Sequence, residues 1–228
     1  MKRTTLASGV LMMSLALTLA ACSPVPFERT PLVAIAPATA GELVGGHWLV
    51  APGVYRCRQT ALFEFRGSRL PLEGFMELDT GSHTARLVAL DGMGLKLLDL
   101  TVTSDGYRQH HLLPALGDYP GLAEAVALSV RRIFLAPRPG PGDTLETGRR
   151  EYRLLQEEGG ENRRFVFGGA GPYLTETTGA GESGRWRVRY YQYRPGPGRP
   201  IPEGVVLEDR RAGFRLTLWL EDVRRIDG

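Results

Sequence analysis

The side chains best suited to covalent chemistry in this 228-residue sequence are the thiols of Cys22 and Cys57. Cys22 ends an apolar run, residues 6–21, that follows the basic pair Lys2 and Arg3. An apolar stretch so short and so close to the start is typical of a secretory signal rather than of a membrane-spanning helix. We therefore expect residues 1–21 to be a signal peptide, and Cys22 to be the first residue of the mature chain.

The residues before Cys22 also bear on its chemistry. Residues 19–22 read Leu-Ala-Ala-Cys, which is similar to the bacterial lipobox. That resemblance implies that Cys22 is the site of lipid attachment and anchors the mature chain to a membrane. Ser23, where Asp would signal retention, implies the outer membrane, with the domain facing the periplasm. The alternatives are an ordinary signal peptide that ends at a cysteine by chance, and a buried N-terminal helix.

Cys57 has no obvious chemical role. If Cys22 carries lipid, Cys57 lacks a partner for an internal disulfide. Arg56 and Arg58 beside it could lower its pKa, but no His and Asp or Asn arrangement accompanies it. We interpret Cys57 as a packed residue of a strand.

The remaining reactive side chains match no catalytic or metal-binding motif. The sequence lacks G-x-S-x-G, H-E-x-x-H and C-x-x-C, and its carboxylates lie mostly at predicted turns. His110 and His111 are adjacent, so in a strand they point to opposite faces and cannot easily share a metal. We therefore predict no enzymatic activity, no metal and no cofactor.

The amino-acid composition limits the kinds of partner that we expect the chain to bind. Without Lys2 and Arg3, the 28 basic residues fall to 26 against 25 acidic ones, a net charge of +1. The basic residues are dispersed along the chain, so we expect no nucleic-acid partner. The length fits one domain. We expect a Pro- and Ala-rich lipidated tether over residues 22–44 and a single β domain over residues 45–228.

Short alternating runs separated by turn residues predict mostly β structure. Asp91-Gly92 and Asp105-Gly106 are typical hairpin turns. The predicted strands cover residues 61–66, 72–78, 84–90, 95–103, 107–113, 152–156, 163–167, 173–178, 186–193, 205–209 and 214–220.

One helix interrupts this pattern, near residues 119–135. Asp118 could cap its N-terminus, and Leu122, Val126 and Val130 follow at helical spacing. A Pro- and Gly-rich segment, residues 137–142, ends it. The fold class is therefore mainly β (α+β): a curled antiparallel half-barrel sheet of about eleven strands, with the central helix as a lid.

Apolar stripes on these elements predict a lined interior, because a curled sheet can hold an apolar ligand if side chains leave it space. The predicted cavity-lining residues are Phe65, Leu87, Leu97, Ile133, Phe134 and Leu218. The alternative for each of them is ordinary core packing.

This arrangement resembles the LolA/LolB superfamily of lipoprotein carriers and receptors, and in particular an uncharacterised proteobacterial lipoprotein family distantly similar to LolB. The resemblance rests on the lipobox with Cys22, the strand–turn–strand segment at residues 85–100, the helix and the closing strand 214–220. It implies a curled sheet with a helical lid over an apolar cavity. It also implies binding or transfer of an acyl chain, from a lipid or a lipoprotein cargo, with Met93 and Leu95 as a membrane-contacting turn.

Two other functions remain open from the sequence. The chain could be a non-enzymatic scaffold for an envelope protein partner, with Trp219, Tyr191 and Tyr193 as an exposed aromatic patch. A lipid hydrolase or thioesterase is the third reading, and it requires a polar cluster inside the cavity.

Overall fold

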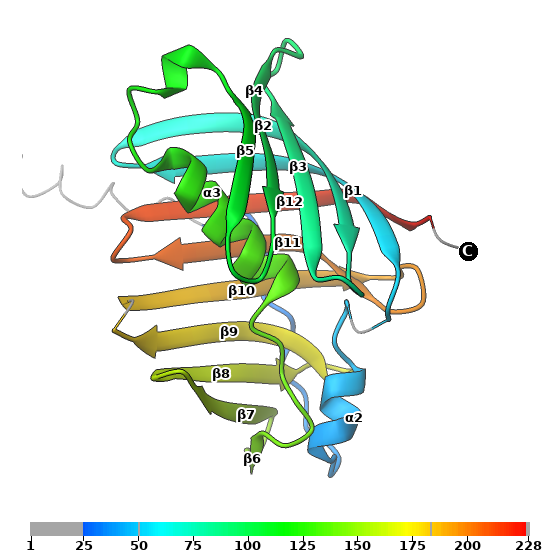
Figure 1. The fold of residues 1–228 in the computed structure, drawn as a ribbon. Coiled ribbons are helices and arrows are strands. Elements are labelled where there is room, and N and C mark those ends of the chain that lie inside the picture. The colour runs from blue at the N-terminus through cyan, green and yellow to red at the C-terminus, as the bar shows by residue number, and fades with distance from the viewer. Residues whose placement is uncertain (1–24, 50, 183, 227–228) are drawn as a thin grey trace, which may run out of the picture.

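The computed structural model describes residues 25–49, 51–182 and 184–226, and both Cys22 and the predicted signal peptide lie outside this part. All its strands belong to a single antiparallel sheet (Figure 1). The strands are β1 (Val54–Phe65), β2 (Ser68–Asp79), β3 (Thr84–Leu90), β4 (Lys96–Val102), β5 (Tyr107–Leu112), β6 (Thr144–Thr147), β7 (Glu151–Glu158), β8 (Glu161–Gly168), β9 (Tyr173–Gly181), β10 (Gly184–Arg194), β11 (Ile201–Asp209) and β12 (Phe214–Arg225).

The sheet consists of two meanders joined at its centre. Its strand order is β5-β4-β3-β2-β1-β12-β11-β10-β9-β8-β7-β6, so the first and last strands of the domain are neighbours. The pairing of β1 with β12 runs from Tyr55 opposite Arg225 to Phe65 opposite Phe214. The sheet has edges at β5 and β6 and is therefore not closed, which confirms the predicted open, curled antiparallel architecture.

The described sheet has twelve strands rather than about eleven. The one that sequence analysis missed is β6, whose four residues, Thr-Leu-Glu-Thr, include only one apolar side chain. A strand this short shows too little alternation to be recognised. It pairs with β7 at the sheet edge.

Alternation of burial along the strands defines an inner and an outer face. In β1, Cys57, Ala61, Phe63 and Phe65 are buried while their neighbours are more exposed. The register shifts within several pairs, for example between Arg58 and Gln59. Bulges of this kind increase the local twist, so they curl the inner face around the core.

Two helical segments cover the inner face. The first, α2 (Ala40–Gly45), is fixed by a capping box between Thr39 and Glu42. The second consists of α3 (Leu122–Val130) and the π-helical turn η3 (Arg131–Leu135), preceded by the 3₁₀ turn η2 (Pro114–Leu116). We call α3 and η3 together the lid, because they cross the concave side of the sheet (Figure 1).

The lid begins later than predicted. Its N-cap is Gly121, with φ of 84° and no side-chain cap hydrogen bond, so the proposed capping by Asp118 is wrong. The reason is local: the amide of Leu122 donates to the carbonyl of Tyr119, which forms a turn just before the helix. Such a positive φ is accessible to Gly at little cost.

The described segment before α2 packs on the sheet. We call residues 25–39 the strap. The ring of Phe27 lies 5.5 Å from that of Tyr191 and 5.4 Å from that of Trp219, on the outer face of β10 and β12. A Cβ at Gly204 would lie 2.5 Å from the Phe27 ring, so only glycine permits this contact. The strap then passes behind the sheet and reaches α2 (Figure 1).

The described helices are also short. None of them is both long and apolar enough to cross a membrane.

Candidate functional site

An apolar pocket lies between the lid and the inner face of the sheet. The lid contributes Val126, Val130, Ile133 and Phe134. Strands β1, β2, β3 and β12 contribute the opposite wall, which includes Ala61, Phe63, Leu72, Leu87, Ala89, Leu216 and Leu218. The space between them is ≈ 30 Å³. A space of this size can hold very few water molecules, so the lid is closely packed on the sheet.

Local sequence explains why these side chains meet. The lid residues fall at i, i+4, i+7 and i+8, one face of a helix. The strand residues alternate, with Ala61 and Phe63 on β1 opposite Leu218 and Leu216 on β12. Ala89 and Leu87 continue the same face through β2 to β3. Each element thus presents its apolar side to the same space.

The structure brings four of the six predicted cavity residues together. Leu87, Ile133, Phe134 and Leu218 line the pocket, and all are buried. Phe65 and Leu97 are also buried but do not line it. Phe65 stacks on Phe63 at the end of β1, and Leu97 lies at the start of β4, where its carbonyl accepts from the amide of Leu113.

Two polar side chains interrupt the apolar wall: Gln59 and Ser129. Ser129 donates to the carbonyl of Ala125 at 2.8 Å. Gln59 is 4% exposed, and its Oε1 has no hydrogen-bond partner among the described residues. The residues that line the pocket include no titratable side chain. A hydrolase would need such a group beside Ser129, so the pocket does not provide the polar cluster that the third reading requires.

Sequence analysis did not single out Gln59. It lies on the inward stripe of β1 between Cys57 and Ala61, at the register shift that follows Arg58. A polar residue at an inward position of an otherwise apolar stripe was the available signal. Gly74, opposite it on β2, leaves room for the side chain, because a Cβ there would lie 2.9 Å from Gln59 Cγ.

An ion pair holds the C-terminal end of the lid on the sheet. Arg132 of η3 forms an ion pair and hydrogen bond with Asp209 of β11, and both side chains are less than a tenth exposed. The Arg132 guanidinium also lies 4.9 Å from the centroid of the Trp186 ring. Beside it, Arg131 Nε donates to the carbonyl of Thr103 at 3.1 Å. Asp209 lies 77 residues from Arg132, so no local pattern indicates this contact.

Cys57 and His47 are buried structural residues in this fold. Burial raises the pKa of the Cys57 thiol to about 12, which keeps it protonated and unreactive. Burial, together with the nearby Arg138, lowers the pKa of His47 to about 3. The Nδ1 of His47 accepts from the amide of Leu49 at 3.1 Å. The described residues include no group of three or more His, Cys, Asp or Glu that could hold a metal.

The predicted aromatic patch is not exposed. Tyr191 is buried, and Trp219 and Tyr193 are only partly exposed. Phe27 of the strap covers Tyr191 and Trp219, while Tyr193 stacks on Tyr173 at 4.6 Å and donates to the carbonyl of Leu174. The prediction that this patch is exposed was therefore wrong. Sequence analysis assigned the strap, which covers the patch, to a tether that does not pack on the domain.

The turn between β3 and β4 does expose apolar side chains. Met93 is 90% exposed and Leu95 is 50% exposed. Asp91 fixes the turn, since its Oδ1 accepts from the amides of Met93 and Leu95 at 2.9 and 2.8 Å. The two apolar side chains are thus presented to solvent by a held turn.

This architecture can now be compared with known proteins. A LolA superfamily protein from Nitrosomonas europaea superposes with a TM-score of 0.52 and 10% identity, over 84% of this chain and 96% of its own. A domain from Vibrio parahaemolyticus, described as that of an outer membrane lipoprotein-sorting protein, gives a TM-score of 0.52 and 9% identity, over 83% of this chain and 91% of its own. The fold is LolA-like. No protein-family model matches the sequence, and no curated protein matches it.

The two covers of the sheet lie on opposite faces. The lid lies on the concave face and encloses the apolar pocket, whereas the strap lies on the outer face of β10 to β12. At identities of 9 to 10%, the comparison concerns the backbone arrangement and carries over no residue role.

Proposed function

We propose that this chain is an outer-membrane-anchored lipoprotein that binds or transfers an acyl chain, from a lipid or a lipoprotein, in the cell envelope. Two features support the proposal. The lipobox ending at Cys22 would provide the anchor, and the apolar pocket beneath the lid would receive the acyl chain. The pocket is the observation that carries the binding function.

The size of the pocket determines how binding must occur. A space of ≈ 30 Å³ is far below the roughly 300–1,000 Å³ of ordinary ligand pockets. An acyl chain can therefore enter only if the lid moves away from the sheet and the ligand replaces lid side chains such as Val126 and Val130. The closed arrangement is then the ligand-free state of the proposed carrier.

The two ends of the lid differ in how they are held. The N-terminal end begins at Gly121 without a side-chain cap, whereas η3 is fastened by Arg132 to Asp209. Opening from the α3 end, with η3 as the fixed end, would expose the inner face of β2 and β3. Met93 and Leu95, exposed on the turn between β3 and β4, would contact the membrane surface during this exchange.

Binding can be tested by filling the pocket from the sheet side. Ala89 faces the pocket, and its neighbour Val88 does not. We expect one fluorescent fatty acid to bind per mature wild-type chain in non-ionic detergent. Ala89→Leu should weaken binding on the order of tenfold, because added methylenes would compete with the ligand for space. Circular dichroism would establish that each variant is folded.

Val88→Leu is the matched control, since it adds apolar volume to the same strand without entering the pocket. It should bind as the wild type does. Failure of the folded wild type to bind the probe would overturn the proposal, and so would equal weakening by both substitutions.

Anchoring requires a separate measurement. Intact-mass spectrometry of the chain purified from bacterial membranes should show cleavage before Cys22 and an added mass of acyl groups. A mature chain in the soluble periplasmic fraction, without added mass, would refute the anchor and leave the binding result unaffected.

A further inference from the structure

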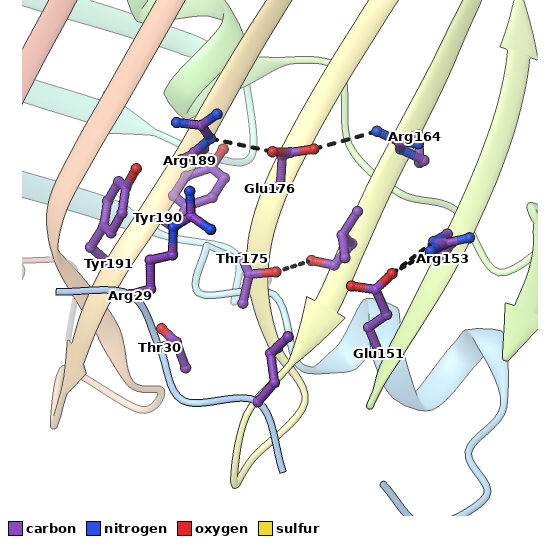
Figure 2. A pocket seen from close by; sticks show the side chains of 12 residues that line it. Arg29, Thr30, Glu151, Arg153, Arg164, Thr175, Glu176, Arg189, Tyr190 and Tyr191 are labelled. Carbon is purple, nitrogen blue, oxygen red and sulfur yellow. Dashed lines mark hydrogen bonds and ion pairs between the residues drawn. The ribbon is translucent and has the colours of Figure 1, made fainter. Parts of the chain in front are cut away.

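A second pocket lies on the outer face, between the strap and strands β7 to β10. Its volume is ≈ 340 Å³, within the range of ordinary ligand pockets. The strap contributes Arg29 and Thr30, and the sheet contributes Arg164, Glu176 and Arg189. Figure 2 shows these side chains converging on the space from the strap on one side and from the strands on the other. We call this space the outer pocket.

Basic groups are in excess there. Four arginines line the outer pocket, Arg29, Arg153, Arg164 and Arg189, against two carboxylates, Glu151 and Glu176. The lining therefore carries two more positive than negative charges. An anion that entered would find a favourable local potential although the chain as a whole is nearly neutral.

The ion pairs within the outer pocket leave several donors free. Glu176 is shared, with Arg164 and Arg189 each at a long 3.4 Å (Figure 2). Arg29 has no hydrogen bond or ion pair within the part of the chain that the structure describes. Glu151 pairs with Arg153. Each guanidinium carries five N–H donors, so these two carboxylates satisfy only a minority of those around this space.

Thr30 shows how closely the strap packs on the sheet beside the outer pocket. The Oγ1 of Thr30, next to Arg29 on the strap, is buried without a hydrogen-bond partner among the described residues. This oxygen has no surface open to the outer pocket, so a ligand there would reach it only if the strap shifted. The methyl group of Thr30 packs at Gly169, where a Cβ would lie 2.8 Å from Thr30 Cγ2.

The arginine donors of the outer pocket are suited to phosphate. Guanidinium groups bind phosphate oxygens through paired N–H donors. A carboxylate ligand would also accept such bonds, and a phosphodiester carries the same single charge. The oxygens of a phosphodiester are arranged tetrahedrally, however, so guanidinium groups from the strap and from different strands can each reach one.

The strap also limits where a membrane can lie. Three peptide links separate Cys22 from Val25, which begins the described strap, and they span at most about 11 Å. If Cys22 is lipidated, the membrane surface must approach the outer face close to Phe27 and Arg29. A lipid headgroup would then be the most concentrated phosphate near the outer pocket.

We propose that the outer pocket binds the phosphate of a membrane phospholipid headgroup, through Arg29, Arg164 and Arg189. The choice of a membrane lipid rests on the proposed anchoring at Cys22. The pocket's ability to bind phosphate rests on its own side chains.

The test uses the mature lipidated chain in non-ionic detergent and calorimetric titration with four soluble probes. These are short-chain phosphatidylglycerol, glycerol 3-phosphate, inorganic phosphate, and a short-chain diacylglycerol that lacks phosphate. We expect the short-chain phosphatidylglycerol to bind at one per chain and more tightly than inorganic phosphate. Arg29→Gln and Arg189→Gln should each weaken it by about tenfold or more.

Arg108→Gln is the matched control, because Arg108 is an exposed arginine on β5, at the far edge of the sheet. It should leave binding unchanged. Equal loss in this control, or no binding of any phosphate compound by the folded wild type, would overturn the proposal. Inorganic phosphate binding as tightly as the lipid would overturn the headgroup assignment and indicate a free phosphate site.

The interior pocket is tested independently in the same variants. Binding of the fluorescent fatty acid should be unaffected by Arg29→Gln, because Arg29 is on the other face of the sheet. A variant that loses phosphate binding but still binds the fatty acid therefore reports on the outer pocket alone. A chain that binds phosphate but not the fatty acid contradicts only the proposed acyl-binding function.

Discussion

The sheet is covered on both faces, and the two covers differ in chemistry. The lid encloses an apolar space of ≈ 30 Å³ and is fastened by a buried ion pair. The strap bounds a space of ≈ 340 Å³ lined by arginine and glutamate, and it is held by the ring of Phe27 on Tyr191 and Trp219. The apolar space is nearly filled by side chains, whereas the charged one remains open.

This difference follows from the kind of side chain that lies beneath each cover. Close packing of apolar side chains is stabilising, so the lid settles onto the sheet unless a ligand separates them. Charged side chains are costly to desolvate, so the strap cannot close onto the arginines in the same way. One sheet thus presents a closed apolar site and an open polar one on opposite faces.

The largest expected effect concerns the fastening of the lid. Asp209→Asn keeps an acceptor for the amides of Arg211 and Ala212 but leaves Arg132 as a buried charge without its partner. We expect a loss of about 3 kcal/mol in the free energy of unfolding, measured by urea denaturation. The double variant Arg132→Met/Asp209→Asn should recover much of this loss, since it buries no unpaired charge.

An exposed ion pair provides the comparison for that experiment. Asp222 pairs with Arg224 at 2.7 Å near the end of β12, where the Arg224 side chain is 76% exposed and that of Asp222 is 42% exposed. Asp222→Asn should therefore change stability by less than about 1 kcal/mol. Similar losses in Asp209→Asn and Asp222→Asn would mean that the lid is not held by Arg132.

A smaller effect is expected on the strap. Phe27→Ala should reduce the free energy of unfolding by about 1–2 kcal/mol, because the half-buried ring loses two aromatic contacts. Limited proteolysis should then cut the strap faster, while the core fragment stays intact. Phe75→Ala, at an exposed phenylalanine on the outer face of β2, is the control and should alter neither measurement. Unchanged cleavage of the strap in Phe27→Ala would show that other contacts hold it.

The smallest expected effect has the opposite sign. Gln59→Met removes the unpartnered Oε1 from the interior pocket and keeps an unbranched side chain beside Gly74. We expect a gain of about 1 kcal/mol in urea denaturation. The control is Gln156→Met, because Gln156 accepts from Arg163 at 3.2 Å and donates to the carbonyl of Arg138. That variant should lose stability, and a loss in Gln59→Met as well would indicate a hydrogen-bonding role for Gln59.

Local patterns in the sequence predict the parts of this fold that depend on neighbouring residues. Asp91-Gly92 and Asp105-Gly106 mark turns, and the spacing of Val126, Val130 and Ile133 marks the apolar face of the lid. Leu87, Ile133, Phe134 and Leu218 meet at one pocket because each lies on the apolar side of its element.

The contacts that sequence analysis missed are distant along the chain or depend on packing. Arg132 and Asp209 meet only after the second meander has curled beneath the lid. Phe27 lies in a Pro- and Ala-rich stretch whose composition is typical of a tether, but Gly204 provides a surface flat enough to receive its ring. Sequence analysis assigned Phe65 and Leu97 to the cavity because both lie on apolar stripes. An apolar stripe shows which face of a strand points inward, but it does not show which part of that strand lies beneath the lid.

The pairing of β1 with β12 has a consequence for how the chain folds. Tyr55 pairs with Arg225 and Phe65 with Phe214, so the centre of the sheet joins residues from opposite ends of the domain. Contacts this distant slow folding, because a long loop must close before they form. During synthesis, β1 must wait as an unpaired edge until β12 emerges, and such an edge is prone to aggregate. A chain exported before it folds would avoid that hazard in the cytoplasm, since both strands would meet only after the whole domain had crossed the membrane.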